Sequence, residues 1–158
     1  TGHLVLSTLH TNDAPSAITR MLELGVPPYL LKATVLGVMA QRLVRTLCPH
    51  CKQPDTVSQE GWSELTKPWK VALPKIIYQP QGCLECRDTG YLGRQGIYEI
   101  MVMSEPVKDH IHEQLNLDQI RRQSMSEGMR TLRLSGAQKV AAGDTTIAEV
   151  LRVAPAQK

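Results

Sequence analysis

Four cysteines carry the clearest chemistry in this sequence of 158 residues. Cys48 and Cys51 form the segment CPHC, and Cys83 and Cys86 form the segment CLEC. Each C-x2-C turn brings two thiolates to one ion, and two such turns supply the four sulfurs of a tetrahedral zinc site. Because the protein then fills all four coordination positions, we expect a structural zinc ion that holds together a segment with little core of its own.

Two alternative interpretations of the same cysteines remain. They could serve disulfide or redox chemistry, or they could be four ordinary thiols. Paired C-x2-C turns in a sequence without a secretion signal favour zinc over disulfides. Thioredoxin-like chemistry would need one C-x-x-C in a βαβ setting, which this sequence does not provide. His50 lies inside the first turn and could replace a cysteine, although four sulfurs already complete the shell.

The segment TGHLVLSTLHTND, residues 1–13, is the second place with potential chemistry. Its run HLVLSTL has the apolar and β-branched composition of a strand buried on both faces, as in parallel α/β sheets. Ligands collect at the carboxyl ends of such strands, where this segment places Ser7, Thr8, His10, Thr11 and Asn12. Such side chains bond phosphate oxygens, so phosphate contact is one hypothesis for His10.

His3 lies too far from His10 for both to contact one phosphate. Seven residues span roughly 23 Å when fully extended at about 3.3 Å per residue. His10 is therefore the better candidate, and His3 would contact a neighbouring strand, loop or subunit. From this stretch alone, satisfied structural histidines are the more frequent alternative.

The helices predicted around these residues follow from capping groups and breakers. A first helix should follow directly, because TND supplies capping groups, Pro15 suits a first turn and Gly25 suits the position after the last turn. A second, mostly apolar helix is predicted from Leu30 to Val44, with the polar pair Gln41 and Arg42 at its end.

The remainder of the chain predicts a mixed α/β fold. Residues 48–86 are rich in Pro, Gln and Lys, which indicates a loop-rich module. The segment GRQGIYEIMVM predicts a strand. Short helices are then predicted from Ser104 and over residues 118–129, 131–142 and 146–153.

The overall charge of the chain identifies no partner. The net charge of +3, from 18 basic and 15 acidic residues, is too small to serve as an electrostatic footprint for nucleic acid or anionic lipid. The longest apolar stretch, residues 29–40, contains Lys32 and is shorter than the roughly 20 residues that span a bilayer. With no export signal either, a cytoplasmic location is expected.

Longer segments resemble the secretion ATPase superfamily, specifically the motors of type II secretion and type IV pilus assembly. The resemblance lies in TGHLVLSTLHTNDAPSAITRMLELGV, QRLVRTLCPHC, GCLECRDTGYLGRQGIYEIM and SEGMRTLRLSGAQKVAAGDTTIAEVLRV, in the family's order and over nearly the whole chain. The paired cysteine turns are similar to those of the general secretory pathway ATPase and the pilus extension ATPase. The retraction ATPase lacks them.

This resemblance implies a fold and a division of the chain. Residues 1–47 would be a remnant of a RecA-like ATPase domain, comprising a strand and the helices that follow it. Residues 48–90 would be a tetracysteine zinc-binding module. Residues 91–158 would form a C-terminal strand and helical subdomain.

The resemblance also assigns roles in nucleotide binding and catalysis. His10 would point toward the terminal phosphate of ATP, and His3 would be the second histidine of the same box. Further candidates for nucleotide contact are Thr8 and Thr11, which flank the site, and Gln41 and Arg42, which could also face an adjacent subunit.

The parent protein implied by the resemblance is a cytoplasmic homohexamer that hydrolyses ATP with Mg²⁺. It would drive pilus or pseudopilus assembly through an inner-membrane platform protein and would lie peripherally at the inner membrane. The phosphate-binding motif G-x-x-x-x-G-K-[ST] and the acidic Walker B segment do not occur in these 158 residues. The chain is therefore expected to be cropped from a longer motor and to be inactive alone.

Two alternatives remain, a zinc-ribbon module that binds nucleic acid and a structural zinc-stabilised interaction domain. Between the cysteine pairs, the basic side chains Lys67, Lys70 and Lys75 are accompanied by the acidic Asp55, Glu60 and Glu64. Because no basic stripe emerges, no nucleic-acid partner is expected.

Overall fold

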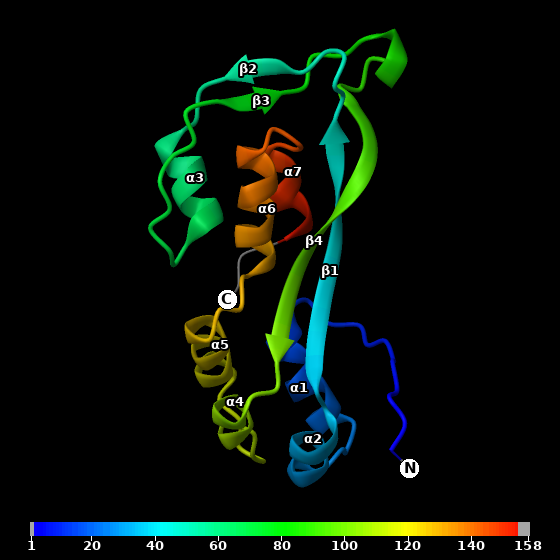
Figure 1. Ribbon diagram of the computed structural model, residues 1–158, viewed down its shortest axis with the longest axis vertical. Helices are drawn as coiled ribbons and strands as arrows, with labels where there is room; N and C mark the ends of the chain where they lie inside the picture. Colours follow the sequence, from blue (N-terminus) through cyan, green and yellow to red (C-terminus); the bar gives the residue numbers. More distant parts are fainter. Residues whose placement is uncertain (1, 155–158) are drawn as a thin grey trace. The chain divides into compact units, whose positions relative to one another are not determined.

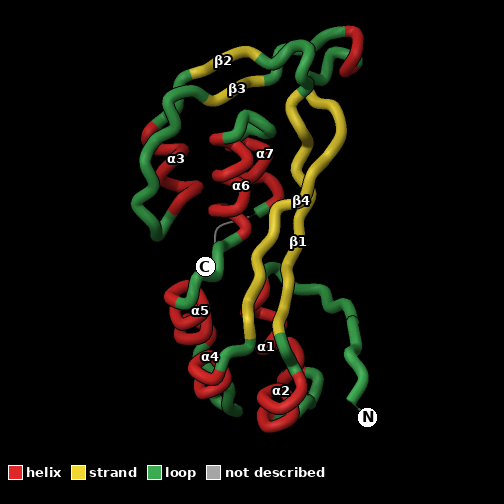
Figure 2. The backbone as a smooth tube through the Cα atoms, viewed as in Figure 1, coloured by secondary structure: helices red, strands yellow, loops and turns green. Residues whose placement is uncertain are grey.

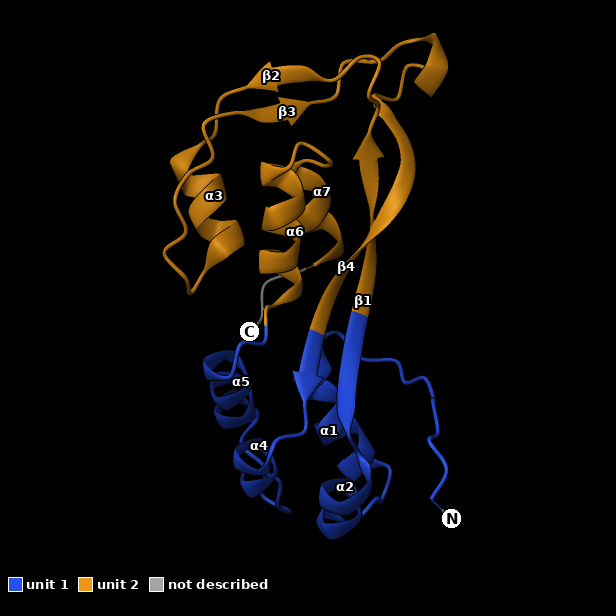
Figure 3. Cartoon of the chain, in the orientation of Figure 1, with its two compact units in different colours: residues 1–40, 100–129 blue, residues 41–99, 130–158 orange. Residues whose placement is uncertain are grey.

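A computed structural model describes residues 2–154 of the chain (Figure 1). The chain divides into two compact units, each built from two segments: residues 1–40 with 100–129, and residues 41–99 with 130–158 (Figure 3). We call them the first and the second unit. Two long strands, β1 (Gly37–Leu47) and β4 (Tyr91–Val102), pair in a two-stranded sheet, and each strand has residues in both units.

The first unit is mainly helical. Its helices are α1 (Ala14–Glu23), α2 (Pro28–Thr34), α4 (Glu105–Asp109) and α5 (Leu117–Ser126). Helix α5 packs against both α1 and α4. The buried core consists of Ala14, Ile18, Leu31, Met101, Met103, Val107, Ile111, Ile120 and Met129.

The beginning of α1 shows the capping chemistry that the sequence predicts. One carboxylate oxygen of Asp13 accepts a hydrogen bond from the backbone N–H of Ser16 at 2.9 Å. Its second oxygen accepts one from the Arg121 guanidinium of α5 at 2.9 Å. Gly25, with a φ of +88°, lies just beyond the end of the helix. The prediction of this helix is confirmed.

The second unit combines short strands with packed helices. Its further elements are β2 (Gln53–Asp55), α3 (Gln59–Thr66), β3 (Ile77–Gln79), the 3₁₀ turn η1 (Leu84–Cys86), α6 (Leu132–Ala141) and α7 (Ile147–Val153). Strands β2 and β3 are antiparallel, with Pro54 opposite Tyr78. Helices α3, α6 and α7 pack against one another. A Cβ atom on Gly136 of α6 would clash with a methyl carbon of Val150 of α7, so glycine permits this close approach.

The strand predicted for HLVLSTL is wrong for the described chain. Residues 2–12 have no regular structure, and Figure 2 draws them as a loop. Leu4, Val5 and Leu6 are exposed, and Leu6 retains 89% of its accessible surface. A strand needs hydrogen-bonding neighbours, and the sheets found within residues 2–154 pair only β1 with β4 and β2 with β3. The RecA-like remnant predicted for residues 1–47 is therefore not confirmed.

The second predicted helix is only partly correct. Helix α2 ends at Thr34, and β1 begins at Gly37. Exposed and more buried residues alternate along most of β1, which is the period of a strand rather than of a helix. Gln41 and Arg42 accordingly lie within β1 and not at the end of a helix. Gly37 and the β-branched residues on both sides of it favour this change of structure.

Most of the later elements agree with the sequence. Strand β4 covers most of the predicted GRQGIYEIMVM, and α4 to α7 lie at the predicted places. The N-terminal ends of these helices are capped by Ser104, Asn116, Thr131 and Thr146. Helix α3 lies in the segment predicted to be loop-rich, where Ser58 caps it and Trp62 and Leu65 bury its apolar face. The mixed α/β composition is confirmed, whereas the ranges 1–47, 48–90 and 91–158 stay predictions.

No helix within residues 2–154 combines the length and the apolar character needed to cross a bilayer.

Candidate metal centre

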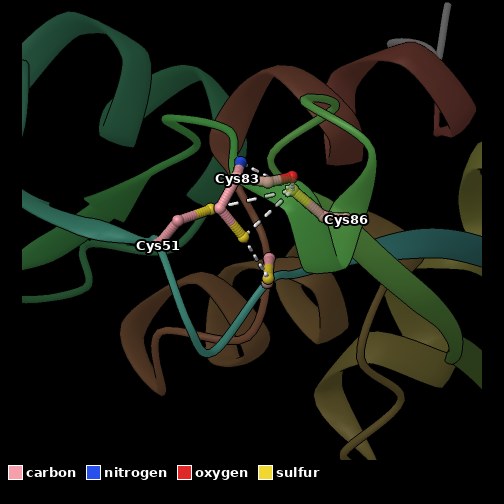
Figure 4. Close-up of side chains that lie close together, drawn as sticks. Cys51, Cys83 and Cys86 are labelled. Carbon is pink, nitrogen blue, oxygen red and sulfur yellow. Dashed lines mark hydrogen bonds between the residues drawn. The ribbon is translucent and has the colours of Figure 1, made fainter.

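The four cysteines lie in two turns of the second unit that adjoin the long strands. Cys48 directly follows β1, and Cys51 lies in the turn before β2. Cys83 and Cys86 belong to the turn around η1, shortly before β4 begins (Figure 4). The backbone N–H of Cys48 donates to the carbonyl of Gly90 at 3.0 Å, which ties the end of β1 to the segment leading into β4.

The four sulfurs have the spacing of a tetrahedral metal site. The Sγ–Sγ distances are 3.9 Å for Cys48–Cys83, 3.8 Å for Cys51–Cys86 and 3.7 Å for Cys83–Cys86. All four sulfurs lie within 4.8 Å of one another. Sulfurs placed tetrahedrally at about 2.3 Å from a zinc ion are separated by about 3.8 Å. The four cysteines are free thiols, so the arrangement fits a zinc centre with four cysteine ligands and not two disulfides.

Backbone N–H groups point at these sulfurs. The N–H of Gly82 donates to Cys51 Sγ at 3.3 Å, and those of Cys83 and Gly90 donate to Cys86 Sγ at 3.2 Å each. Such donors stabilise thiolates, which are the form of cysteine that binds a metal. Arg87, with a φ of 53°, curls the backbone back around the Cys86 sulfur after η1.

The two sulfurs of the second turn differ in acidity. Desolvation opposes ionisation of Cys86, but the N–H donors of Cys83 and Gly90 outweigh it and lower its pKa to about 6. A backbone hydrogen bond with Cys86 stabilises the thiolate of Cys83, yet desolvation and the neighbouring thiols raise the pKa of Cys83 to about 11. Four thiolates at this spacing repel one another, so a cation is needed to hold them all deprotonated.

The centre is largely shielded from solvent. Cys48, Cys51 and Cys86 are buried, and Cys83 is half-buried. His50 is exposed and is not among the grouped ligands, so the structure does not support its use in place of a cysteine. With all four ligands supplied by the protein, the site leaves no position for a reactive water molecule.

An ionic cluster around the buried carboxylate of Glu149 joins β1 to α7, and no local pattern in the sequence predicts it. Glu149 is 2% exposed. Its carboxylate accepts hydrogen bonds from the side chains of Arg45 and Arg152 and from the backbone N–H of Arg45. Hydrogen bonding by Arg45 is the largest cause that lowers the pKa of Glu149, to about 2. The Arg45 guanidinium also lies 4.1 Å from the centre of the Tyr91 ring.

Two further contacts fix β1 and the first cysteine turn to the connection between α6 and α7. The backbone N–H of Leu47 donates to the carbonyl of Asp144 at 2.7 Å. Lys52 donates to the carbonyl of Gly143 at 2.8 Å and lies 4.6 Å from the centre of the Tyr78 ring. The metal centre is thus built against a packed helical pair.

The residues predicted to bind nucleotide, unlike the four cysteines, are spread over both units. His3, Thr8 and His10 are exposed on the irregular segment 2–12 of the first unit. Thr11 is half-buried, and its hydroxyl donates to the Asp13 carbonyl at 3.1 Å. Gln41 and Arg42 lie on β1 in the second unit. The nucleotide roles of all these residues stay predictions.

Comparisons with known proteins agree with the resemblance seen in the sequence. Residues 1–152 match the family described as "Type II/IV secretion system protein". The chain is 52% identical over 98% of its length to the "Type IV pilus assembly ATPase TfpB" of Acinetobacter baylyi. It is 45% identical over 97% of its length to the "Type II secretion system protein E" of Pseudomonas aeruginosa, and 40% identical over 96% to the "Type IV pilus assembly ATPase PilB" of Myxococcus xanthus. The chain spans 26% of the first of these relatives, 30% of the second and 27% of the third.

Proposed function

Because the chain belongs to the type II/IV secretion system protein family, we propose that it is the C-terminal portion of an ATPase that powers type II protein secretion or type IV pilus assembly. The observation that carries this proposal is the match over nearly the whole chain to relatives named for these two processes. The proposed parent is a cytoplasmic homohexamer, peripheral to the inner membrane, that acts through an inner-membrane platform protein. ATP and Mg²⁺ would be bound mainly by residues outside this chain.

His10 is the residue of this chain that we propose contacts the terminal phosphate of ATP. Its exposed side chain on the segment 2–12 is accessible to a nucleotide held by other parts of the parent. Thr8 and Thr11 would flank the phosphate, and His3 would contact a neighbouring loop or subunit. Gln41 and Arg42 would face the nucleotide or an adjacent subunit.

We propose that zinc at the cysteine centre is structural. The ion would compensate the charge of four thiolates and crosslink the end of β1 to the turn before β4. The sulfur spacing and the N–H donors support this assignment.

The nucleotide role is tested by His10→Ala in the full-length parent, with His112→Ala, another exposed histidine, as the matched control. Loss of a positioned imidazole should lower ATP turnover on the order of 100-fold. Zinc content should stay the same in both variants. Normal turnover of His10→Ala would contradict the role of this residue.

The metal assignment is tested by elemental analysis and thiol titration of the purified chain. One zinc per chain is expected, with thiols that react only after chelation. Oxidised cysteines without metal would instead support the disulfide interpretation. Oligonucleotide binding that weakens steeply with salt would favour the alternative of a nucleic-acid module.

A further inference from the structure

The loop between α3 and β3 has a charge pattern that the overall charge of the chain does not reveal. Lys67, Lys70 and Lys75 in this loop are exposed. No acidic residue occurs anywhere from residue 65 to residue 84. We call residues 67–76 the basic loop; it belongs entirely to the second unit (Figure 3).

Apolar side chains alternate with these lysines. Val71 is 40% exposed, Leu73 is 39% exposed and Ile76 is 50% exposed. Trp69, between two of the lysines, is half-buried. The basic loop therefore presents ammonium groups and aliphatic groups to solvent together.

Hydrogen bonds to α3 hold the loop in this arrangement. Trp62 is 3% exposed, and its indole N–H donates to the carbonyl of Val71 at 3.1 Å. The backbone N–H of Trp69 donates to the carbonyl of Thr66 at 2.9 Å. Because the backbone is anchored on a buried tryptophan, the exposure of Val71 and its neighbours is a feature of the fold.

The acidic residues of α3 do not neutralise the loop. Glu64 pairs with Arg133 of α6 at 3.6 Å. Glu60 is in the first turn of α3, and seven residues of helix separate it from Lys67 by roughly 10 Å along the axis. Among the described residues, none of the three lysines forms an ion pair.

We propose that the basic loop docks this protein on the anionic surface of a lipid bilayer. The three lysines bind headgroup phosphates, and Val71, Leu73 and Ile76 enter the boundary between headgroups and acyl chains. Exposed aliphatic groups beside the cations favour a membrane over nucleic acid, whose phosphates need only the cations. This docking surface is additional to the proposed function, which places the parent at the membrane through a protein partner.

The first test is sedimentation of the purified chain with vesicles of phosphatidylcholine, with or without phosphatidylglycerol. The chain should bind only the anionic vesicles, and less at higher salt. Lys67→Gln, Lys70→Gln and Lys75→Gln combined should weaken binding about 100-fold, because each lysine near an anionic surface contributes on the order of five-fold. The matched control removes three charges elsewhere, at Lys32, Lys108 and Lys139, and should bind within about two-fold of the unchanged chain.

Two further measurements separate lipid docking from general attraction to polyanions. Val71→Ser, Leu73→Ser and Ile76→Ser combined should weaken binding at least about five-fold, since aliphatic burial is lost. Trp69 emission should shift to shorter wavelength on anionic vesicles, and Trp69→Phe should remove most of this shift.

Some results would overturn the proposal. The chain would fail to bind anionic vesicles, or the loop and control lysine variants would lose binding equally. The serine variant would bind as well as the unchanged chain, or tryptophan emission would not change. None of these results bears on the ATPase proposal, because the test uses neither nucleotide nor parent protein.

Discussion

The cysteine turns and the N-terminal segment both have residues suited to chemistry, but the described chain assembles only one of them. Cys48 and Cys86 come together because the ends of β1 and β4 are paired and because backbone N–H groups are aimed at the sulfurs. His10 lies on exposed backbone that pairs with no strand within residues 2–154. A metal site needs only short turns brought together by one pair of strands, whereas a strand-end site needs a surrounding sheet.

Among the substitutions that compare these two regions, loss of one sulfur of the cysteine centre should lower the stability most. Cys86→Ser removes a buried ligand, and we expect the second unit to lose at least about 3 kcal/mol of stability. Thermal unfolding with and without chelator measures this loss. His50→Ala, an exposed change in the same pair of turns, should cost under about 0.5 kcal/mol. An equal loss in both variants would show that the cysteines do not form a stabilising centre.

Loss of the ionic cluster around Glu149 should give the next largest loss of stability. Glu149→Gln leaves Arg45 and Arg152 without their shared carboxylate, at a cost of about 2 kcal/mol once the partial exposure of both arginines is considered. Denaturant unfolding at neutral pH measures the difference. Arg152→Gln removes only one of the two arginines and should cost less than about 1 kcal/mol.

The stability difference between the unchanged chain and Glu149→Gln should depend on pH in a definite direction. The pKa of Glu149 is lowered from 4.5 to about 2 in the folded chain. Its contribution is therefore complete above the unfolded value of 4.5 and is lost as the pH falls through the folded value. The gap in stability between the unchanged chain and Glu149→Gln should shrink between pH 4.5 and about 2. A gap that stays constant over this interval would contradict the ionic contribution of Glu149.

Loss of the N-terminal cap of α1 in the first unit should cost less stability. Asp13→Ala removes the bond to the Ser16 N–H and the pair with Arg121, and about 1.5 kcal/mol of stability should be lost. Asp118→Ala removes a more exposed partner of Arg121 and should cost under about 0.5 kcal/mol. Denaturant midpoints compare the two variants, and equal midpoints would argue against the cap.

The success of sequence analysis follows the range of the interactions. The capping bond of Asp13 to Ser16 spans three positions, and each C-x2-C turn also holds its two cysteines three positions apart, so local patterns predict both features well. The meeting of the two turns spans 35 positions, and the shared metal-ligand chemistry of the cysteines, not a local pattern, predicts it. The residues of β1 predict a helix when read locally, but the partner strand β4 lies far along the chain, and pairing outweighs local preference. The Arg45–Glu149 pair joins residues 104 positions apart and has no local pattern at all.

A substitution in the N-terminal segment should have the smallest effect on the stability of this chain. It also tests most directly whether that segment becomes ordered in the parent. Leu6 is 89% exposed, so Leu6→Ser should change the stability of this chain by less than about 0.3 kcal/mol. In the full-length parent, the same substitution should cost about 3 kcal/mol if HLVLSTL becomes a buried strand beside residues that this chain does not include. The control Leu84→Ser, at an exposed site of the second cysteine turn, should be neutral in both proteins. A neutral Leu6→Ser in the parent would mean that the segment stays exposed there, and the phosphate role of His10 would then lose its structural support.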